Sequence, residues 1–246
     1  MAEGLRLAVR AWSAWAPERE TPAAWRAWAG ATDMAVGETD GGSIAVPMML
    51  RRRCTALGQK MLASALACGE TALTGRYVLA SRHGEFSRTL GILKSLAAHE
   101  LPSPAEFSMS VHNGLAGLLS IHLGNTGGHT ALAAGLDTFG FGFMEAAARV
   151  VEQPSEPVLL LYGDEPLPGE FGIFGKDDID LPLVVALALQ APAAGDDGIS
   201  FQAVPSGAGA QPSTAAAIDF LRFLLSGARS AVSEGDRMTW TWRRAA

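Results

Sequence analysis

Cysteine is scarce in this chain of 246 residues, which contains only Cys54 and Cys68. Both fall in the apolar segment 50–69, which is predicted to be helical. Along a straight helix, a separation of 14 residues puts the two thiols too far apart to form a disulfide. The sequence therefore excludes a disulfide framework and favours a reducing compartment. Because neither cysteine has metal-ligand spacing, both are expected to be small core residues.

An excess of basic residues is also missing, since 19 Lys and Arg stand against 25 Asp and Glu, for a net charge of −6. This balance argues against a nucleic-acid partner. No apolar run is long enough to cross a bilayer. The beginning of the chain carries Glu3, Arg6 and Arg10, which a signal peptide would not have in its apolar region. A cytoplasmic protein without a membrane span is therefore expected.

Apolar residues make up 48% of the chain, which is enough for a large core. Short apolar segments bounded by Gly, Pro or Asp are predicted to be strands: Leu5–Trp12, Tyr77–Ser81, His129–Leu136, Pro157–Tyr162, Leu183–Gln190, Ile199–Val204 and Met238–Arg243. Longer segments are predicted to be helices: Met49–Cys68, Glu85–His99, Val111–Leu123, Thr138–Glu152 and Thr214–Arg229. Strands and helices alternate through the middle, which predicts a single α/β domain over residues 1–246 with a layered sheet.

The two segments richest in Gly, Pro and Asp, Gly163–Asp180 and 192–213, are predicted to be surface loops. The helices at Val111–Leu123 and Thr138–Glu152 are apolar enough to form a buried central pair. The tryptophans lie near the two ends of the chain, at positions 12, 15, 25, 28, 240 and 242. Side chains of this size predict that both ends dock on the core.

The turn between the predicted strand His129–Leu136 and the helix that follows is the most informative feature. The segment Phe107–Ile121 is followed by a strand, this turn and a helix. That order of segments resembles the nucleophile elbow of a condensing enzyme of the ketosynthase type. A ketosynthase would place a cysteine there, whereas this turn reads Gly-Leu-Asp-Thr over residues 135–138. Leucine offers no chemistry, and an aspartate would form a labile mixed anhydride instead of a thioester. Asp137 is therefore interpreted as the N-cap of the following helix.

Further motifs occur in a fixed order along nearly the whole chain. They are Trp25 and Trp28, Pro47 followed by Arg51–Arg53, Ser81–Glu85, Ser110–Asn113, Gly135–Glu145, Asp164–Pro166, and an ending with Trp240, Trp242 and Arg243. Together they resemble the short β-ketoacyl-synthase-like family found beside aryl polyene and dialkylresorcinol ketosynthases, whose members are described as chain length factors.

This resemblance implies the amino-terminal half of the thiolase fold, a layered α/β/α arrangement with a mixed sheet. The carboxy-terminal half of a ketosynthase supplies two catalytic histidines, and this chain is too short to contain it. All five histidines lie between His83 and His129. The position of the missing nucleophile is Leu136 when the comparison is anchored on Asn113. It is Asp137 when the anchors are Gly140 and Arg149, and the sequence leaves both open.

The function that the resemblance implies is a non-catalytic chain length factor in aryl polyene-like, type II polyketide or fatty-acid-like biosynthesis. It would pair with a full-length ketosynthase through the strand near His129–Leu136 and the segment before Asn113. The acyl carrier protein would visit the partner. The residues expected to form the acyl tunnel or the interface are Phe107, Met109, Ser110, His112, Asn113, Leu136 and Phe139. Arg51, Arg52 and Arg53 are candidate contacts for an acidic partner or carrier protein, and no cofactor or metal is expected.

Two alternatives remain. A stand-alone acyltransferase or thioesterase would use His83 or His112 with a carboxylate such as Glu85. A structural stabiliser of the ketosynthase would leave the product unchanged. Against the first alternative, His83 is also explained as a loop histidine that hydrogen-bonds the backbone, and His112 as a capping or interface group at the start of a helix. Asp164 and Glu165 lie among prolines that predict a rigid solvent-exposed loop.

Overall fold

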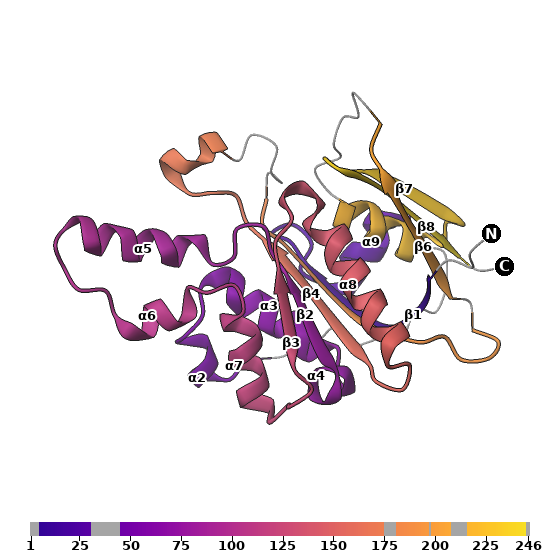
Figure 1. The fold of residues 1–246 in the computed structure, drawn as a ribbon, viewed down its shortest axis with the longest axis horizontal. Helices are drawn as coiled ribbons and strands as arrows, with labels where there is room; N and C mark the ends of the chain where they lie inside the picture. The colour runs from indigo at the N-terminus through magenta and orange to yellow at the C-terminus, as the bar shows by residue number, and fades with distance from the viewer. Residues whose placement is uncertain (1–4, 31–44, 175–180, 197, 208–215, 245–246) are drawn as a thin grey trace.

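The computed structural model describes residues 5–30, 45–174, 181–196, 198–207 and 216–244 (Figure 1). Its centre is an eight-stranded sheet in the order β3-β2-β4-β5-β1-β6-β8-β7. The strands are β1 Leu5–Trp15, β2 Arg76–Ala80, β3 His129–Leu132, β4 Val158–Asp164, β5 Leu183–Gln190, β6 Ile199–Pro205, β7 Ser230–Glu234 and β8 Met238–Arg244. β2 is parallel to β3 and β4, whereas β5 is antiparallel to β4 and β1, so the sheet is mixed as expected.

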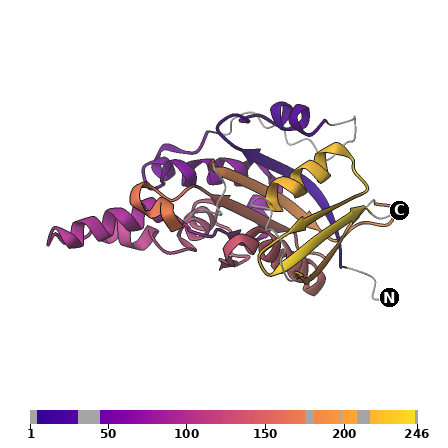
Figure 2. The same ribbon diagram turned by 90° about the horizontal axis from the view of Figure 1, so that it is seen from above.

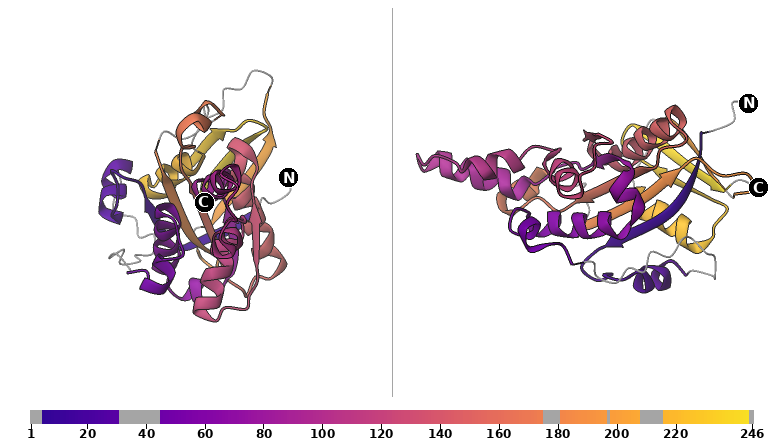
Figure 3. Two further views of the ribbon diagram at one scale, coloured as in Figure 1. Left: turned by 90° about the vertical axis from the view of Figure 1, so that its left-hand side faces the viewer. Right: turned by 90° about the horizontal axis from the view of Figure 1, so that it is seen from below.

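Helices cover both faces of this sheet, as the views in Figures 2 and 3 show. They are α1 Pro22–Ala29, α2 Met48–Arg51, α3 Ala56–Ala67, α4 Glu70–Thr74, α5 Phe86–Ala97, α6 Pro104–Met109, α7 Gly114–Leu123, α8 Thr138–Glu152 and α9 Ala216–Ser226, with two short 3-10 helices, η1 Gly135–Asp137 and η2 Gly169–Phe174. Because both faces are covered, β4 is buried along its whole length. Among the described residues, no helix is both long and apolar enough to span a membrane.

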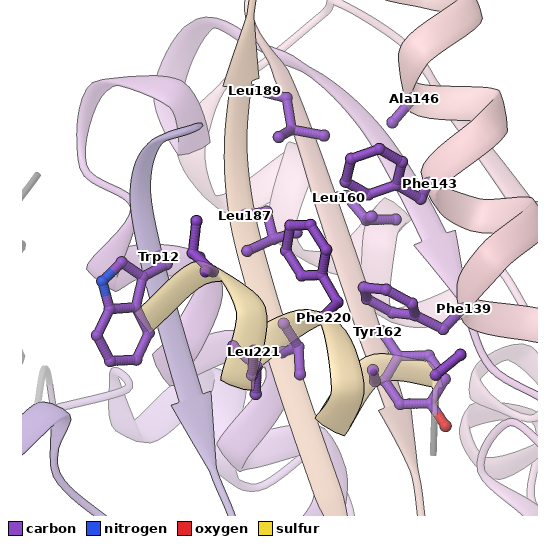
Figure 4. Close-up of a cluster of buried hydrophobic side chains, with 14 of the residues drawn as sticks. Trp12, Phe139, Phe143, Ala146, Leu160, Tyr162, Leu187, Leu189, Phe220 and Leu221 are labelled. Atoms are coloured by element: carbon purple, nitrogen blue, oxygen red, sulfur yellow. The ribbon is translucent and has the colours of Figure 1, made fainter. Parts of the chain in front are cut away.

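The strands alternate their side chains between two cores. Val185, Leu187 and Leu189 of β5 face one core, which contains α8, α9 and α1. Val184 and Ala186 face the other, which contains α3 and α7. In the first core, Phe139 and Phe143 of α8 meet Phe220 of α9 (Figure 4). Trp12, Trp25, Trp240 and Trp242 are buried, so both terminal regions dock on the core as expected.

The predicted helix over Met49–Cys68 is wrong because the chain breaks into α2 and α3. Thr55 causes the restart, since its hydroxyl accepts a hydrogen bond from the Gly58 N–H at 3.1 Å and caps α3. Cys54 lies in the break and Cys68 directly follows α3, and both cysteines are free thiols.

The predicted strand His129–Leu136 is too long, because β3 ends at Leu132. Gly135 then adopts a positive φ of 62°, which glycine tolerates, and η1 leads into α8. α7 is buried along one side only, since Leu115, Leu118 and Leu119 are covered but Ile121 is 81% exposed. It covers one face of the sheet beside β3, and Ile121 on its outer side is left exposed by the residues that the structure describes.

Several short elements escaped the sequence prediction: α1, α4, α6, β7 and η2. The expected loop at Gly163–Asp180 is wrong at its beginning, because Gly163 and Asp164 are the buried end of β4. Residues 175–180, the 208–213 part of the second expected loop, and the expected helix start at Thr214 lie outside the described residues. The helix expected there includes α9, which ends at Ser226.

Candidate functional site

The elbow joins β3 to α8 through the turn of η1. At its centre Asp137 is completely buried. Its carboxylate accepts hydrogen bonds from the Arg237 backbone N–H at 2.8 Å and from the Trp240 indole N–H at 3.0 Å. The Arg237 guanidinium lies 3.6 Å from the same carboxylate. A buried carboxylate is stable only when it is bonded in this way, so the β7–β8 hairpin completes the elbow.

Asp137 holds the N-cap position of α8, as interpreted from the sequence, but the expected capping role of its side chain is wrong. Asp137 directly precedes α8, but its side chain makes no capping bond to the helix. The turn is closed instead by Thr138, whose hydroxyl donates to the Gly135 carbonyl at 2.6 Å and accepts from the Ala134 N–H at 3.0 Å. The carboxylate is free to bond a segment about a hundred residues further along the chain.

Two glycines allow the hairpin to approach the elbow this closely. A Cβ on Gly235 would lie 1.7 Å from the Asp137 carboxylate oxygen, and one on Gly140 would lie 2.2 Å from the Trp240 ring. Both distances are far below van der Waals contact. The hairpin therefore packs directly against Asp137, one of the two positions expected from the sequence to replace the nucleophile. Leu136, the other candidate for that position, is half-buried in η1.

Neither thiol of the chain replaces the missing nucleophile. Cys68 belongs to the core around α3 and α7, and Cys54 packs against it, whereas Phe139 beside the elbow lies in the core on the opposite face of the sheet. Burial raises the pKa of Cys54 to about 11 and that of Cys68 to about 12. Both thiols are therefore overwhelmingly protonated at neutral pH, and a protonated thiol is a poor nucleophile.

Asp164 lies where the parallel strands β2 and β4 end, and its predicted place in a solvent-exposed loop is wrong. It is 4% exposed and accepts hydrogen bonds from the Ser81 hydroxyl at 2.9 Å and the His83 N–H at 3.1 Å. The Arg82 N–H also donates to it at 2.9 Å. Burial raises the pKa of Asp164, while these hydrogen bonds act in the opposite direction. The carboxylate holds the loop that follows β2 in one conformation.

The two histidines of the stand-alone enzyme hypothesis are part of this loop and its support. One ring nitrogen of His112, Nε2, lies 2.9 Å from the Ser81 carbonyl oxygen. The His112 ring also packs under Gly84, where an added Cβ would lie 3.2 Å from it. Ser81 donates to Asp164 and accepts from the Gly84 N–H, so its only hydroxyl proton is committed to the turn. This arrangement braces a loop, and it does not present an exposed nucleophile beside a base.

Glu85, the carboxylate proposed beside His83, is turned into the protein and belongs to a different set of contacts. Its side chain is 6% exposed and pairs with the Arg88 guanidinium at 2.8 Å. Its other oxygen accepts from the Thr55 hydroxyl at 2.6 Å. Within the described ranges, no group of three or more His, Cys, Asp or Glu side chains is arranged to hold a metal ion.

The tunnel and interface candidates separate into buried and exposed side chains. Met109 and Phe139 are 5% and 2% exposed and lie in the cores of this chain. Phe107 on α6 is 63% exposed, and the Ser110 hydroxyl donates to its carbonyl at 2.9 Å. Asn113 is exposed at the start of α7, and its amide nitrogen lies 3.3 Å from the Nε2 atom of His129.

These exposed residues follow one another along one side of the molecule. Figure 1 shows β3, α7, α6 and α5 side by side, and the contacts between neighbouring elements agree with this order. Exposed apolar side chains accompany them: Leu93, Leu96, Leu101, Phe107, Val111 and Ile121. Arg51, Arg52 and Arg53 are exposed nearby, just after Met48 and Met49, which are 66% and 83% exposed.

Comparison with known proteins identifies relatives of this arrangement. The family model described as "Beta-ketoacyl synthase, N-terminal domain" matches residues 25–243. One chain of the complex between the ketosynthase ApeO and its chain length factor ApeC from Xenorhabdus doucetiae is 28% identical, with a TM-score of 0.82. That match covers 98% of this chain and 100% of the other. No curated protein sequence matches this chain.

More distant structures share the fold alone. A chain of the ishigamide ketosynthase/chain length factor is 15% identical with a TM-score of 0.59, over 81% of this chain and 67% of that one. A β-ketoacyl synthase from Burkholderia phymatum STM815 is 14% identical with a TM-score of 0.56, over 91% of this chain and 71% of that one. The layered thiolase-like fold with its mixed sheet is thereby confirmed.

Proposed function

Because this chain belongs to the β-ketoacyl synthase N-terminal domain family, we propose that it is a non-catalytic chain length factor that pairs with a full-length ketosynthase. The match to a chain of a ketosynthase–chain length factor complex, over essentially all of both chains, supports this assignment. We further propose that the complex serves aryl polyene-like biosynthesis, as the motifs of the sequence suggest.

The observation that carries the proposal is the state of the elbow. Claisen condensation on a carrier-bound chain requires a thiolate that forms a thioester. Here the two candidate positions hold Leu136 and a fully buried Asp137 whose carboxylate is bonded to Trp240 and Arg237. Thioester transfer, decarboxylation and condensation therefore belong to the partner, and the acyl carrier protein visits that partner.

The proposed pairing surface is the free edge of β3. Among the described strands, β3 lies at one end of the sheet and pairs only with β2. The Gly128 carbonyl accepts from the Tyr77 N–H of β2, and the Leu132 carbonyl accepts from the N–H of Ser81, just after β2. The main-chain groups of Ala131 alternate with these and point away from β2. An exposed strand edge is a template for a strand of another chain. Asn113 and His129 lie beside it as polar contacts.

Phe107 is the residue that we propose to reach the acyl tunnel of the partner. It is the exposed aromatic side chain of α6, whereas Met109 and Phe139 pack inside this chain. A bulky side chain at the closed end of a tunnel stops chain growth early, and a small one lengthens the cavity. Ser110, which bonds the Phe107 carbonyl, borders the same position. Arg51, Arg52 and Arg53 remain candidate contacts for an acidic carrier or partner.

Co-expression with a full-length ketosynthase encoded beside this protein tests the pairing. We expect the two chains to co-purify in equal amounts, and the chain expressed alone to self-associate through its apolar face. Ala131→Pro removes one N–H from the free edge of β3 and should reduce the co-purified amount, whereas Ala131→Gly keeps that N–H and serves as the control. A stable monomer that does not co-purify, or one that extends an acyl chain alone, would overturn the proposal.

A further inference from the structure

The pair of helices α5 and α6 forms an arm that extends from one end of the molecule (Figures 2 and 3). Large apolar side chains on it are exposed, with Leu93 at 48%, Leu101 at 95% and Phe107 at 63%. Of the residues of α5, from Phe86 to Ala97, Arg88 alone is buried. Phe86 at the start of α5 also contacts the Phe171 ring, with the centroids 5.2 Å apart. Because the one buried side chain of the helix is charged, polar contacts contribute strongly to its orientation.

The Arg88 guanidinium bonds three separate segments at the base of the arm. Its side chain is 5% exposed. Nε donates to Glu85 at 2.8 Å, in the turn before α5. One terminal nitrogen pairs with Glu106 on α6, and the other donates to the Arg53 carbonyl at 2.8 Å, just after α2. A planar guanidinium with several donors suits this task, which a lysine ammonium cannot reproduce.

Glu85 connects this set of contacts to the rigid body of the protein. Its second oxygen accepts from Thr55, the residue that caps α3. A Cβ added to Gly58 would lie 2.4 Å from that oxygen, so the carboxylate rests directly against α3. α3 packs on one face of the sheet, against β5, β1 and β4, and offers a fixed reference. Glu85 and Arg88 therefore hold α6 in a fixed position relative to the core.

From these contacts we infer that Arg88 is a positioning residue that sets product length by fixing where α6 presents Phe107 to the partner. The inference rests on the function proposed above. Glu106 directly precedes Phe107, so the bond from Arg88 to Glu106 fixes the rotation of α6 about its own axis next to Phe107. When that bond is lost, Phe107 samples several positions, and the partner releases chains of several lengths.

The test uses the complete chain in its complex with the ketosynthase, and it separates three readouts. These are the amount of co-purified complex, the total rate of malonyl consumption, and the distribution of product lengths by mass spectrometry. Glu106→Gln keeps the shape of a half-exposed side chain and removes its charge. Arg88→Lys keeps the charge and loses the planar fork. Glu152→Gln removes a similar exposed partner of an arginine on α8 and is the matched control.

We expect Glu106→Gln and Arg88→Lys to raise the share of off-length products by roughly two-fold or more, because small displacements of a positioning group change selectivity. The amount of complex should stay unchanged for Glu106→Gln and for Glu152→Gln. If Arg88→Lys does not fold, Glu106→Gln still decides the question.

Phe107→Trp separates the proposed tunnel role of Phe107 from the positioning role of Arg88. If Phe107→Trp shortens the products while Glu106→Gln leaves the distribution unchanged, the role of Arg88 is overturned and the tunnel assignment stands. If neither variant alters the distribution in an intact complex, the tunnel role of α6 is overturned together with this inference. A rate loss with an unchanged length distribution also overturns it, because a merely structural contact would have that effect.

Discussion

The carboxylate of Asp137 accepts a hydrogen bond from the Trp240 indole N–H at 3.0 Å, across 103 residues of sequence. The bond joins the turn before α8 to strand β8, and it lies in a site with no solvent exposure. The turn before α8 is thereby fastened to the β7–β8 hairpin by a buried carboxylate.

The first prediction concerns this bond. Asp137→Ala leaves the fully buried Trp240 indole N–H without its acceptor, which should lower the free energy of unfolding by about 1 to 3 kcal/mol. Asp137→Asn keeps an oxygen acceptor and should cost less. Chemical denaturation measures both. Asp236→Ala, at an exposed neighbouring position, is the control and should have little effect. Equal stability of Asp137→Ala and the control would show that the bond is not important.

The second prediction is that restoring a cysteine does not restore chemistry. Asp137→Cys places a thiol in a fully buried site beneath Trp240, where burial raises its pKa and no acyl carrier can reach it. Intact-protein mass spectrometry after incubation with an acyl carrier should find no thioester on this variant, nor on Leu136→Cys. Labelling with a thiol reagent should become complete only after unfolding. Stoichiometric acylation of either folded variant would contradict a non-catalytic elbow.

The third prediction compares two glycines in helices. Gly140→Ala in α8 would drive a Cβ into the Trp240 ring at 2.2 Å, and overpacking of this kind costs about 1 to 3 kcal/mol. Gly91→Ala in α5 meets nothing within 4 Å and should stabilise the helix by about 0.5 to 1 kcal/mol. Thermal unfolding of the purified complex measures both. A Gly140→Ala variant as stable as the unsubstituted protein, or more stable, would mean that Trp240 does not pack on α8 as described.

The fourth prediction concerns pH. Burial raises the pKa of Asp164, so the folded protein holds this proton to a higher pH than the unfolded chain does. The stabilisation from this group is complete below the unfolded pKa of about 4 and is lost as the pH rises through the folded pKa. Asp164→Asn should therefore make the free energy of unfolding less steeply dependent on pH in that window, as denaturation at a series of pH values would measure.

Asp196 provides the control of opposite sign. The Ala193 N–H and Arg10 lower the pKa of this partly exposed carboxylate, so its small contribution to stability is present above the unfolded pKa and is lost as the pH falls through the folded pKa. Asp196→Asn should leave the slope attributed to Asp164 in place. If Asp164→Asn instead steepens the loss of stability with rising pH, the hydrogen bonds of Ser81, Arg82 and His83 outweigh the burial of that carboxylate.

Much of the fold could be predicted from periodicity. Every predicted strand is present, and α8 begins and ends where the sequence places it, because an apolar pattern reports directly on burial. The prediction of one helix over Met49–Cys68 was wrong because Thr55 competes for the backbone N–H groups that an unbroken helix would use. The sequence did not predict β7, because its residues are mostly exposed and show no apolar pattern. Its strand conformation depends on pairing with β8.

The candidate site was only partly predictable. The missing cysteine is visible in the letters Gly-Leu-Asp-Thr, and the family follows from motifs spread over the chain. The partners of Asp137 are not visible, because nothing local indicates a bond to a residue 103 positions away. For the same reason Asp164 was expected in solvent, although its neighbours Ser81, Arg82 and His83 surround it in the fold.

The amino-acid sequence by itself determined that this protein has a layered α/β fold and an elbow without a thiol, since both follow from residue types in local order. Only the tertiary structure decided what the residues of the elbow do. Strands β2, β3 and β4 are parallel neighbours, and the β7–β8 hairpin folds back onto α8. The buried carboxylate of Asp137 therefore accepts hydrogen bonds from residues about a hundred positions further along the chain. Because it is buried, it needs these bonds.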